Sequence, residues 1–194
     1  AEYDALPELG HGCGHNLIAM VSVGCGIACR EFADEYGAQI DVIGTPAEET
    51  AGTKVPMSAK GVFDGYDAVM MAHPAFANAE SINTIAMDAY KIEFFGRPAH
   101  AAAAPHEGIN ALDAMINFFN LVNAMRQQTK PDARIHGIIT DGGKAANVIP
   151  DYTAANFYIR ANRVADVKKL AERVRNCAAG AALGTGCTYK MEYN

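Results

Sequence analysis

The first half of the chain alternates short apolar runs with loops that are rich in glycine or acidic residues. Two apolar runs have the length of buried strands, the first residues are interpreted as the end of a strand, and two longer stretches have the composition of helices. The strand candidates are residues 1–4, 39–44 and 68–72, and the helix candidates are residues 16–36 and 53–60. This order predicts an α/β unit whose mainly parallel sheet is covered by helices on both faces.

The longer helix candidate, 16–36, has recognisable signals at both ends. Asn16 is a residue type that caps helix N-termini, and Gly37 is the residue type that most often ends a helix. Between them, small and apolar residues lie on more than one face of the helix. This distribution is typical of a helix that packs tightly against a sheet.

The second half of the chain has a different pattern, which predicts a second domain. Its segments follow the order β-α-β-β-α-β of the ferredoxin-like fold. The strands are predicted at 88–95, 134–140, 152–159 and 187–191, and the helices at 108–128 and 164–182. We therefore expect a boundary near Ala86, with one domain over residues 1–86 and an α+β domain over residues 87–194.

Composition and charge narrow the class of protein. The 194 residues have a formal net charge of −6 and contain no run of lysine or arginine, which argues against a nucleic-acid partner. No apolar run reaches the roughly 18–20 residues that a membrane span requires, so we expect no membrane partner. The five cysteines are odd in number and irregularly spaced, which is typical of a reducing compartment and predicts a cytoplasmic protein.

Candidate chemistry begins in the loop His11-Gly12-Cys13-Gly14-His15. A thiol and imidazoles between glycines are good ligands for a transition metal, because glycines let the backbone bend around an ion. A structural zinc knuckle is disfavoured, since no second Cys/His pair follows at the usual spacing. A cysteine-protease dyad would require Cys13 and His15 to face each other across a cleft. Taken alone, the loop is equally compatible with surface histidines and a buried cysteine.

Two adjacent carboxylates, Glu48 and Glu49, follow the apolar run 39–44. Neighbouring side chains leave the backbone in different directions, so one can bind a metal ion while the other accepts a proton from metal-bound water. A solvated acidic turn, or a helix N-terminus with favourable negative charge, is the simpler interpretation of the pair alone.

His73 follows the apolar run 68–72 and is either a residue at a sheet edge or a ligand. The segments 10–16, 44–49 and 73–74 each follow a strand candidate. Ligands of open α/β sheets bind where loops leave the carboxyl ends of the strands, so the three segments are expected to form one site. The side chains expected to meet there are Cys13, His15, Glu48, Glu49 and His73.

These motifs resemble those of a known family. The segments 1–7, 10–16, 44–49 and 72–74 are similar, in this order, to the amidohydrolase branch of the aminoacylase and carboxypeptidase-type metallopeptidases, peptidase family M20. That branch includes auxin-conjugate hydrolases, and the dipeptidases and aminobenzoyl-glutamate hydrolases within it are most similar. The resemblance implies part of a two-metal catalytic domain, followed by an inserted ferredoxin-like domain that serves as lid and dimerisation domain.

The resemblance also implies a set of metal ligands. Cys13 matches the ligand that bridges two metal ions, His15 matches a ligand of one ion, and Glu49 and His73 match further ligands. Glu2 stands where other branches have a metal-binding histidine, so a metal role is not assigned to it. Two divalent ions are expected; a thiolate and imidazoles favour zinc, and the carboxylate also tolerates manganese or cobalt.

Three further roles follow from the same resemblance. Glu48 matches the general base that deprotonates the metal-bridging water and then protonates the leaving amine. Asp4 matches a carboxylate that orients a metal ligand. His100, in Gly96-Arg97-Pro98-Ala99-His100-Ala101, matches a lid histidine that reaches the active site of a partner subunit and polarises the scissile carbonyl. From the residues alone, His100 is a loop residue without an assigned function.

The remaining candidates concern the substrate and the partner. Asn147 matches a lid asparagine that helps to bind substrate, and Arg160 is either a counter-ion for a substrate carboxylate or a solvated strand residue. His106 and His136 have no matching role and are interpreted as surface or structural residues. The resemblance implies a homodimer that forms through the lid domain.

Two classes of function follow. The first is metal-dependent hydrolysis of an amide bond in an N-acyl-amino acid, aminobenzoyl-glutamate or dipeptide. The second is a non-catalytic module for ligand binding or dimerisation that retains the fold. Family members are longer, and the part after their lid carries a further histidine ligand. We therefore expect these 194 residues to be a fragment and, alone, a poor catalyst.

Overall fold

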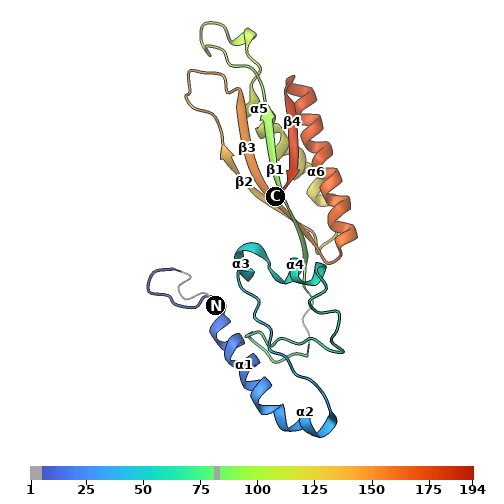
Figure 1. The fold of residues 1–194 in the computed structure, drawn as a ribbon. Helices are drawn as coiled ribbons and strands as arrows, with labels where there is room; N and C mark the ends of the chain where they lie inside the picture. Colours follow the sequence, from blue (N-terminus) through green and yellow to red (C-terminus); the bar gives the residue numbers. More distant parts are fainter. Residues whose placement is uncertain (1–5, 81–83) are drawn as a thin grey trace. The chain divides into compact units, whose positions relative to one another are not determined.

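The computed structural model describes residues 6–80 and 84–194 (Figure 1). The chain divides into two compact units, Ala1–Glu80 and Ser81–Asn194.

In residues 6–80, the first unit contains four helices and the loops between them. They are α1 (His15–Ala28), α2 (Arg30–Tyr36), α3 (Glu48–Ala51) and α4 (Lys54–Ala59). The single helix predicted over 16–36 is interrupted at Cys29, and its two parts differ in direction by 43°. Its N-terminal cap is Gly14 rather than Asn16, whereas Gly37 ends α2 in the left-handed conformation as expected.

No single helix among the described residues has both the length and the apolar composition to cross a membrane. The bent pair of α1 and α2 meets the two criteria only when its parts are taken together.

The mainly parallel sheet expected in the first unit is not formed by residues 6–80, which contain no strand. Among these residues the apolar runs 39–44 and 68–72 form no strand ladder, and ladder hydrogen bonds are what define a strand. Their side chains are correspondingly exposed, Ile40 by 45% and Met70 by 90%. Helix α1 likewise contains no buried residue within the described part of the chain. The third strand candidate, 1–4, lies outside the described residues.

The second unit has the predicted order β-α-β-β-α-β. Its elements are β1 (Ala86–Phe95), α5 (Ala111–Met125), β2 (Arg134–Asp141), β3 (Tyr152–Ala161), α6 (Val164–Thr185) and β4 (Thr188–Tyr193), with 3-10 turns η1 (Pro105–Glu107) and η2 (Arg126–Gln128). The sheet order is β2-β3-β1-β4, and every neighbouring pair is antiparallel. Helix α5 connects β1 to the parallel strand β2 across β3, and α6 connects β3 to the parallel strand β4 across β1. This arrangement confirms the ferredoxin-like prediction.

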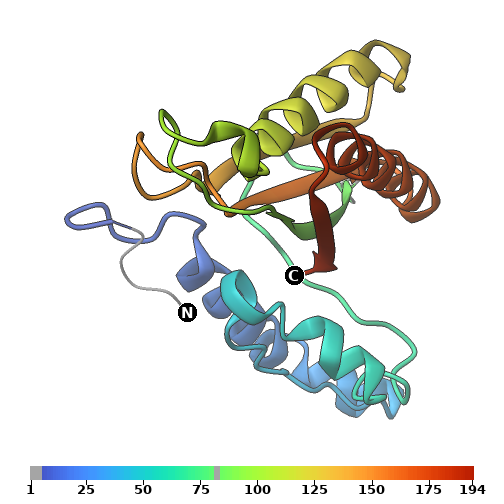
Figure 2. The same cartoon turned by 90° about the horizontal axis from the view of Figure 1, so that it is seen from above.

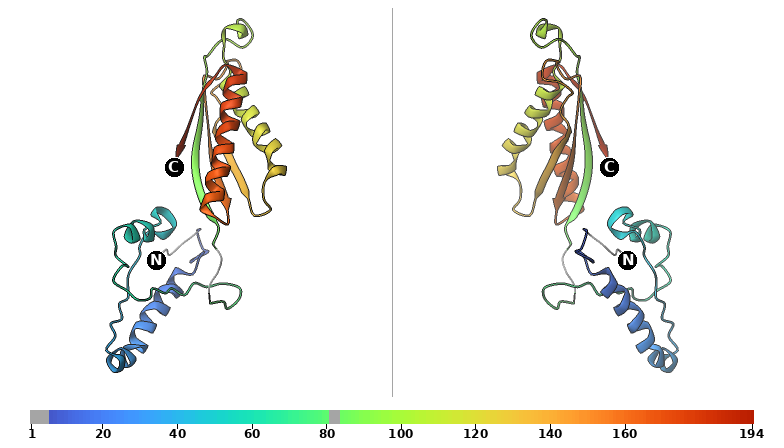
Figure 3. Two further views of the ribbon diagram at one scale, coloured as in Figure 1. Left: turned by 90° about the vertical axis from the view of Figure 1, so that its right-hand side faces the viewer. Right: turned by 90° about the vertical axis from the view of Figure 1, so that its left-hand side faces the viewer.

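Both helices of the second unit cover the same face of the sheet (Figures 2 and 3). The alternation along β1 turns Ile92 and Phe94 toward these helices, and both side chains are fully buried. Phe118 of α5 is also fully buried, with its ring centroid 5.0 Å from that of Phe157 and 5.9 Å from that of Phe94. These aromatic contacts join helix α5 to the two central strands, β1 and β3.

The other face of the sheet carries a buried carboxylate. Glu93 is only 8% exposed, and its Oε1 accepts hydrogen bonds from Lys91 Nζ at 2.7 Å and from Tyr152 Oη at 2.6 Å. These two donors, the lysine first, hold the pKa of Glu93 below its usual range, although burial acts in the opposite direction. The carboxylate therefore contributes stability only while it is ionised.

We expect a Glu93→Gln variant to lose about 1 kcal/mol of unfolding free energy near neutral pH, since it weakens hydrogen bonds to a charged acceptor. A carboxyl with a lowered pKa stabilises the fold above its unfolded pKa, about 4.3, and ceases to do so as the pH falls through its folded pKa. Urea unfolding across pH 2–7 should therefore show the difference between variant and wild type shrinking in acid. Glu192→Gln, in an exposed ion pair, is the control; a difference that persists below the folded pKa would contradict the assignment.

Candidate functional site

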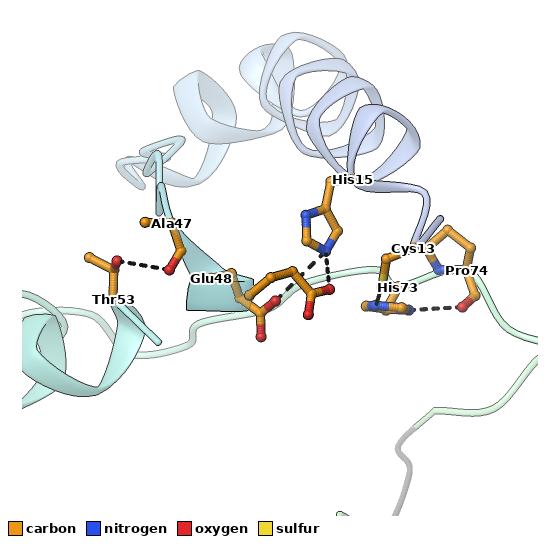
Figure 4. A network of polar contacts seen from close by, with 8 residues as sticks. Cys13, His15, Ala47, Glu48, Thr53, His73 and Pro74 are labelled. Carbon is orange, nitrogen blue, oxygen red and sulfur yellow. Dashed lines mark hydrogen bonds and ion pairs between the residues drawn. The ribbon is translucent and has the colours of Figure 1, made fainter. Parts of the chain in front are cut away.

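Cys13 and His73, 60 positions apart in the chain, are brought together in the first unit (Figure 4). Cys13 lies in the loop before α1, and its Sγ is 3.3 Å from Nε2 of His73. The other ring nitrogen of His73, Nδ1, is 2.8 Å from the carbonyl oxygen of Pro74. A carbonyl oxygen can only accept a hydrogen bond, so Nδ1 of His73 carries the ring proton. The lone pair of Nε2 then faces the sulfur of Cys13.

His15, the first residue of α1, connects this pair to the two carboxylates (Figure 4). Its Nε2 is 3.4 Å from Oε1 of Glu49 and 3.7 Å from Oε2 of Glu48. Two groups of three potential ligands therefore share His15, and within each group the ligand atoms lie within 4.8 Å of one another. The groups are Cys13, His15 and His73, and His15, Glu48 and Glu49.

The donor set and its spacing fit a transition-metal site. Ligand atoms around a tetrahedral zinc ion are separated by about 3.3–3.8 Å, as metal–ligand distances of roughly 2.0–2.3 Å require. The separations of Cys13 from His73 and of His15 from Glu48 and Glu49 fall in or close to this range. The side chain of His15 is only 14% exposed, whereas those of Glu48 and Glu49 are 44% and 49% exposed. The carboxylates thus form the solvent side of the site.

The two glutamates do not diverge as their adjacency suggested, because both reach the same nitrogen of His15. They occupy the first turn of α3, where long side chains from neighbouring positions can converge. The assignment of one to metal binding and the other to proton transfer therefore remains a prediction. Asp4, the predicted orienting carboxylate, lies outside the described residues.

Ala47 is a feature of the site that sequence reasoning missed. It precedes Glu48 and has a φ of 57°, a left-handed conformation that costs a residue with a Cβ roughly 1 kcal/mol or more. Thr53 supports this turn by donating a hydrogen bond from Oγ1 to the Ala47 carbonyl at 3.5 Å. The strained turn starts α3 in the direction that points both carboxylates toward His15. Alanine carries no sequence signal for such a conformation.

In the second unit, His100 and Asn147 lie on adjoining segments. His100 and Val148 form an isolated antiparallel bridge, and the Ala101 amide donates to the Asn147 carbonyl at 3.0 Å. Nδ1 of His100 accepts from the amides of Ala102 and Ala103, both at 3.2 Å. Nε2 must then carry the proton of the neutral ring, which makes it a hydrogen-bond donor.

Arg160 lies elsewhere, near the C-terminal end of β3, whereas Asn147 precedes the start of that strand. Its guanidinium carbon is 6.0 Å from the ring centroid of Tyr158, a cation–π distance. Its buried Nε has no hydrogen-bond partner within the part of the chain that the structure describes. His136 packs edge-on against the same tyrosine, with ring centroids 5.7 Å apart. Arg160 is therefore not brought together with His100 and Asn147.

Comparison with known proteins identifies the class. Residues 86–185, which are 100 of the 194 residues, match the family model of the peptidase dimerisation domain of M20 peptidases. The chain belongs to this family, so the family membership expected from the resemblance is confirmed.

Particular relatives agree with this membership. The chain is 42% identical over 195 residues to the Xaa-Arg dipeptidase of Mus musculus, covering 98% of this chain and 45% of that protein. It is 36% identical over 191 residues to one of the p-aminobenzoyl-glutamate hydrolase subunits of Escherichia coli K12, covering 96% and 40%. It therefore spans less than half the length of these relatives.

Among solved structures, an aminobenzoyl-glutamate utilization protein from Klebsiella pneumoniae is similar in fold. It aligns with a TM-score of 0.50 and 24% identity, over 57% of this chain and 28% of its own.

Proposed function

We propose that this chain contains most of the metal-binding residues and the whole lid of a two-metal amidohydrolase. The observation that carries the proposal is the convergence of thiol, imidazole and carboxylate groups from three separate segments of the chain around His15. Such a mixed set suits zinc first, and manganese or cobalt second. The alternative, a non-catalytic module that retains the fold, has no structural reason to keep these five side chains together.

The proposed reaction is hydrolysis of an amide bond in a small substrate. When bound, the metal ions would supply Lewis acidity to the attacking water and to the substrate carbonyl. Cys13, His15, Glu49 and His73 would hold them. Glu48, half exposed at the solvent side, would accept the proton of the attacking water and return it to the leaving nitrogen.

His100 is proposed to stabilise the negative charge that develops on the carbonyl oxygen. The support is its tautomer: two backbone amides occupy Nδ1, so that Nε2 can donate a hydrogen bond. Asn147, on the adjoining segment, is proposed to contact the substrate. As in the family resemblance, we propose that His100 acts in the site of a second subunit, within a homodimer formed through the dimerisation domain.

The proposed substrates are dipeptides with a basic C-terminal residue, followed by aminobenzoyl-glutamate and N-acyl-amino acids. The names of the two relatives above support the first two classes. Arg160 is a weaker candidate for binding the substrate carboxylate, because it lies away from His100 and Asn147. A cytoplasmic location also remains a proposal.

Metal content tests the proposal. The chain, stripped with a chelator and dialysed against zinc, should retain close to two equivalents by elemental analysis. It should then hydrolyse at least one of the substrates proposed above, even if slowly. His15→Ala should reduce zinc retention, because His15 belongs to both ligand groups. His136→Ala, outside the site, should not change it. Zinc retention indistinguishable between wild type and His15→Ala would overturn the proposed site and favour the non-catalytic module.

A further inference from the structure

Gly14 and Pro74 face each other beside the candidate metal ligands, with no room for a side chain between them. A Cβ added to Gly14 would lie 3.0 Å from Cγ and 3.6 Å from Cβ of Pro74, so a side chain there would press against the proline ring. Gly14 also has a φ of 77° and is the N-terminal cap of α1. The carbonyl of Gly14 accepts hydrogen bonds from the amides of Leu17 and Ile18. The position therefore requires glycine for two separate reasons.

Every candidate ligand of one group lies one residue from this contact. Cys13 precedes Gly14, His15 follows it, and His73 precedes Pro74. A displacement of Pro74 by a few tenths of an ångström would act directly on the 3.3 Å separation of Cys13 Sγ and His73 Nε2. It would also act on the carbonyl of residue 74, which holds the ring of His73. The Gly14–Pro74 contact is thus placed to set the ligand spacing.

We propose that Gly14 and Pro74 are positioning residues, which hold the loop of Cys13 and His15 at the correct distance from His73 for one metal ion. This inference rests on the proposed metal site. Neither residue offers a metal ligand of its own, so their effect passes through the three ligands. Outer contacts of this kind typically change metal affinity by about 10–100-fold.

The chain contains a matched control for the backbone strain. Gly10 lies in the same loop with a φ of 69°, close to that of Gly14, but no described heavy atom lies within 4 Å of the position of its added Cβ. Gly10→Ala therefore introduces a strained left-handed alanine without the clash. Gly14→Ala introduces both. The difference between the two variants isolates the contact with Pro74.

Pro74→Ala provides a rescue. It removes Cγ, the atom at 3.0 Å, while the remaining Cβ at 3.6 Å is at an ordinary contact distance, and it keeps the carbonyl that orients His73. In the double variant Gly14→Ala/Pro74→Ala, the added methyl group therefore has room. A purely structural effect of a strained alanine would not be relieved by this second change.

The test is a competition titration of zinc against a chromogenic chelator for wild type, the three single variants and the double variant. Cobalt substitution, monitored through the thiolate-to-cobalt absorption band, reports separately on Cys13. We expect Gly14→Ala to bind zinc at least about 10-fold more weakly than Gly10→Ala and to lose intensity in the cobalt band. The double variant should return to within about threefold of Gly10→Ala.

The outcomes separate this inference from the proposed function. If wild type binds no zinc or cobalt, the proposed metal site fails, and this inference fails with it. If wild type binds both ions but Gly14→Ala matches Gly10→Ala, or the double variant is not rescued, the metal site stands and the positioning role is wrong. Circular dichroism of each variant shows whether helix content is retained. If Gly14→Ala has lost its helices, the double variant with Pro74→Ala decides the outcome. Recovery of helix content supports the role of the Gly14–Pro74 contact, and no recovery overturns it.

Discussion

Under the proposed mechanism, replacing Glu48 with glutamine is expected to lower the turnover number of the zinc-loaded chain by about 10²–10⁴-fold without loss of bound zinc. Glutamine retains the size of the side chain, but it cannot accept a proton from water. The carboxylate of Glu48 approaches Nε2 of His15 to 3.7 Å, at the more distant of the two carboxylate contacts. Both carboxylates approach the same nitrogen of His15, so the assignment of Glu48 as base and Glu49 as ligand rests on the family resemblance. The measurement is turnover on a dipeptide substrate with metal analysis of the same sample.

Glu49→Gln is the matched control, because it makes the same chemical change one residue away. The Glu49 carboxylate approaches His15 to 3.4 Å and is proposed as a ligand. This variant should lose metal and activity together, whereas Glu48→Gln should lose activity alone. If Glu48→Gln releases metal while Glu49→Gln retains it, the two roles are exchanged. The proposed mechanism would then require Glu49 as the base.

The second large effect concerns stability. Phe118→Ala is expected to lower the unfolding free energy of the dimerisation domain by about 3–5 kcal/mol, because it leaves a cavity at the centre of the core. Phe118 is fully buried and contacts the rings of Phe94, Phe119 and Phe157. Helix α5 would thereby lose its main attachment to strands β1 and β3. Denaturant unfolding, followed by circular dichroism, measures the change.

Ile116→Ala controls for the loss of a large apolar residue from the same helix. Ile116 is 48% exposed, so its removal opens no enclosed cavity and should cost less than about 1 kcal/mol. A Phe118→Ala variant that is destabilised no more than Ile116→Ala would show that the aromatic cluster does not hold the domain together. A loss of zinc binding by either variant would be unexpected, since neither residue belongs to the candidate metal site.

The second unit was predictable because its elements complete each other. Every strand of the β-α-β-β-α-β order has a pairing partner within the same unit, Ser81–Asn194, and the alternation along β1 selects the face on which α5 and α6 pack. Local periodicity and long-range pairing therefore agree. The first unit differs, because its apolar runs 39–44 and 68–72 have no pairing partner among residues 6–80. Periodicity alone could not reveal that.

The residue types of the site, the family that its motifs resemble and the elements of the dimerisation domain could all be predicted from the sequence. These depend on which side chains are present and on their spacing along the chain. Which of these groups meet depends on the folded chain. It brought Cys13 to His73 across 60 positions, directed both Glu48 and Glu49 toward His15, and placed His100 beside Asn147 but not beside Arg160. These distances depend on backbone conformations such as the left-handed ones of Gly14 and Ala47. The type of a single residue does not predict such a conformation.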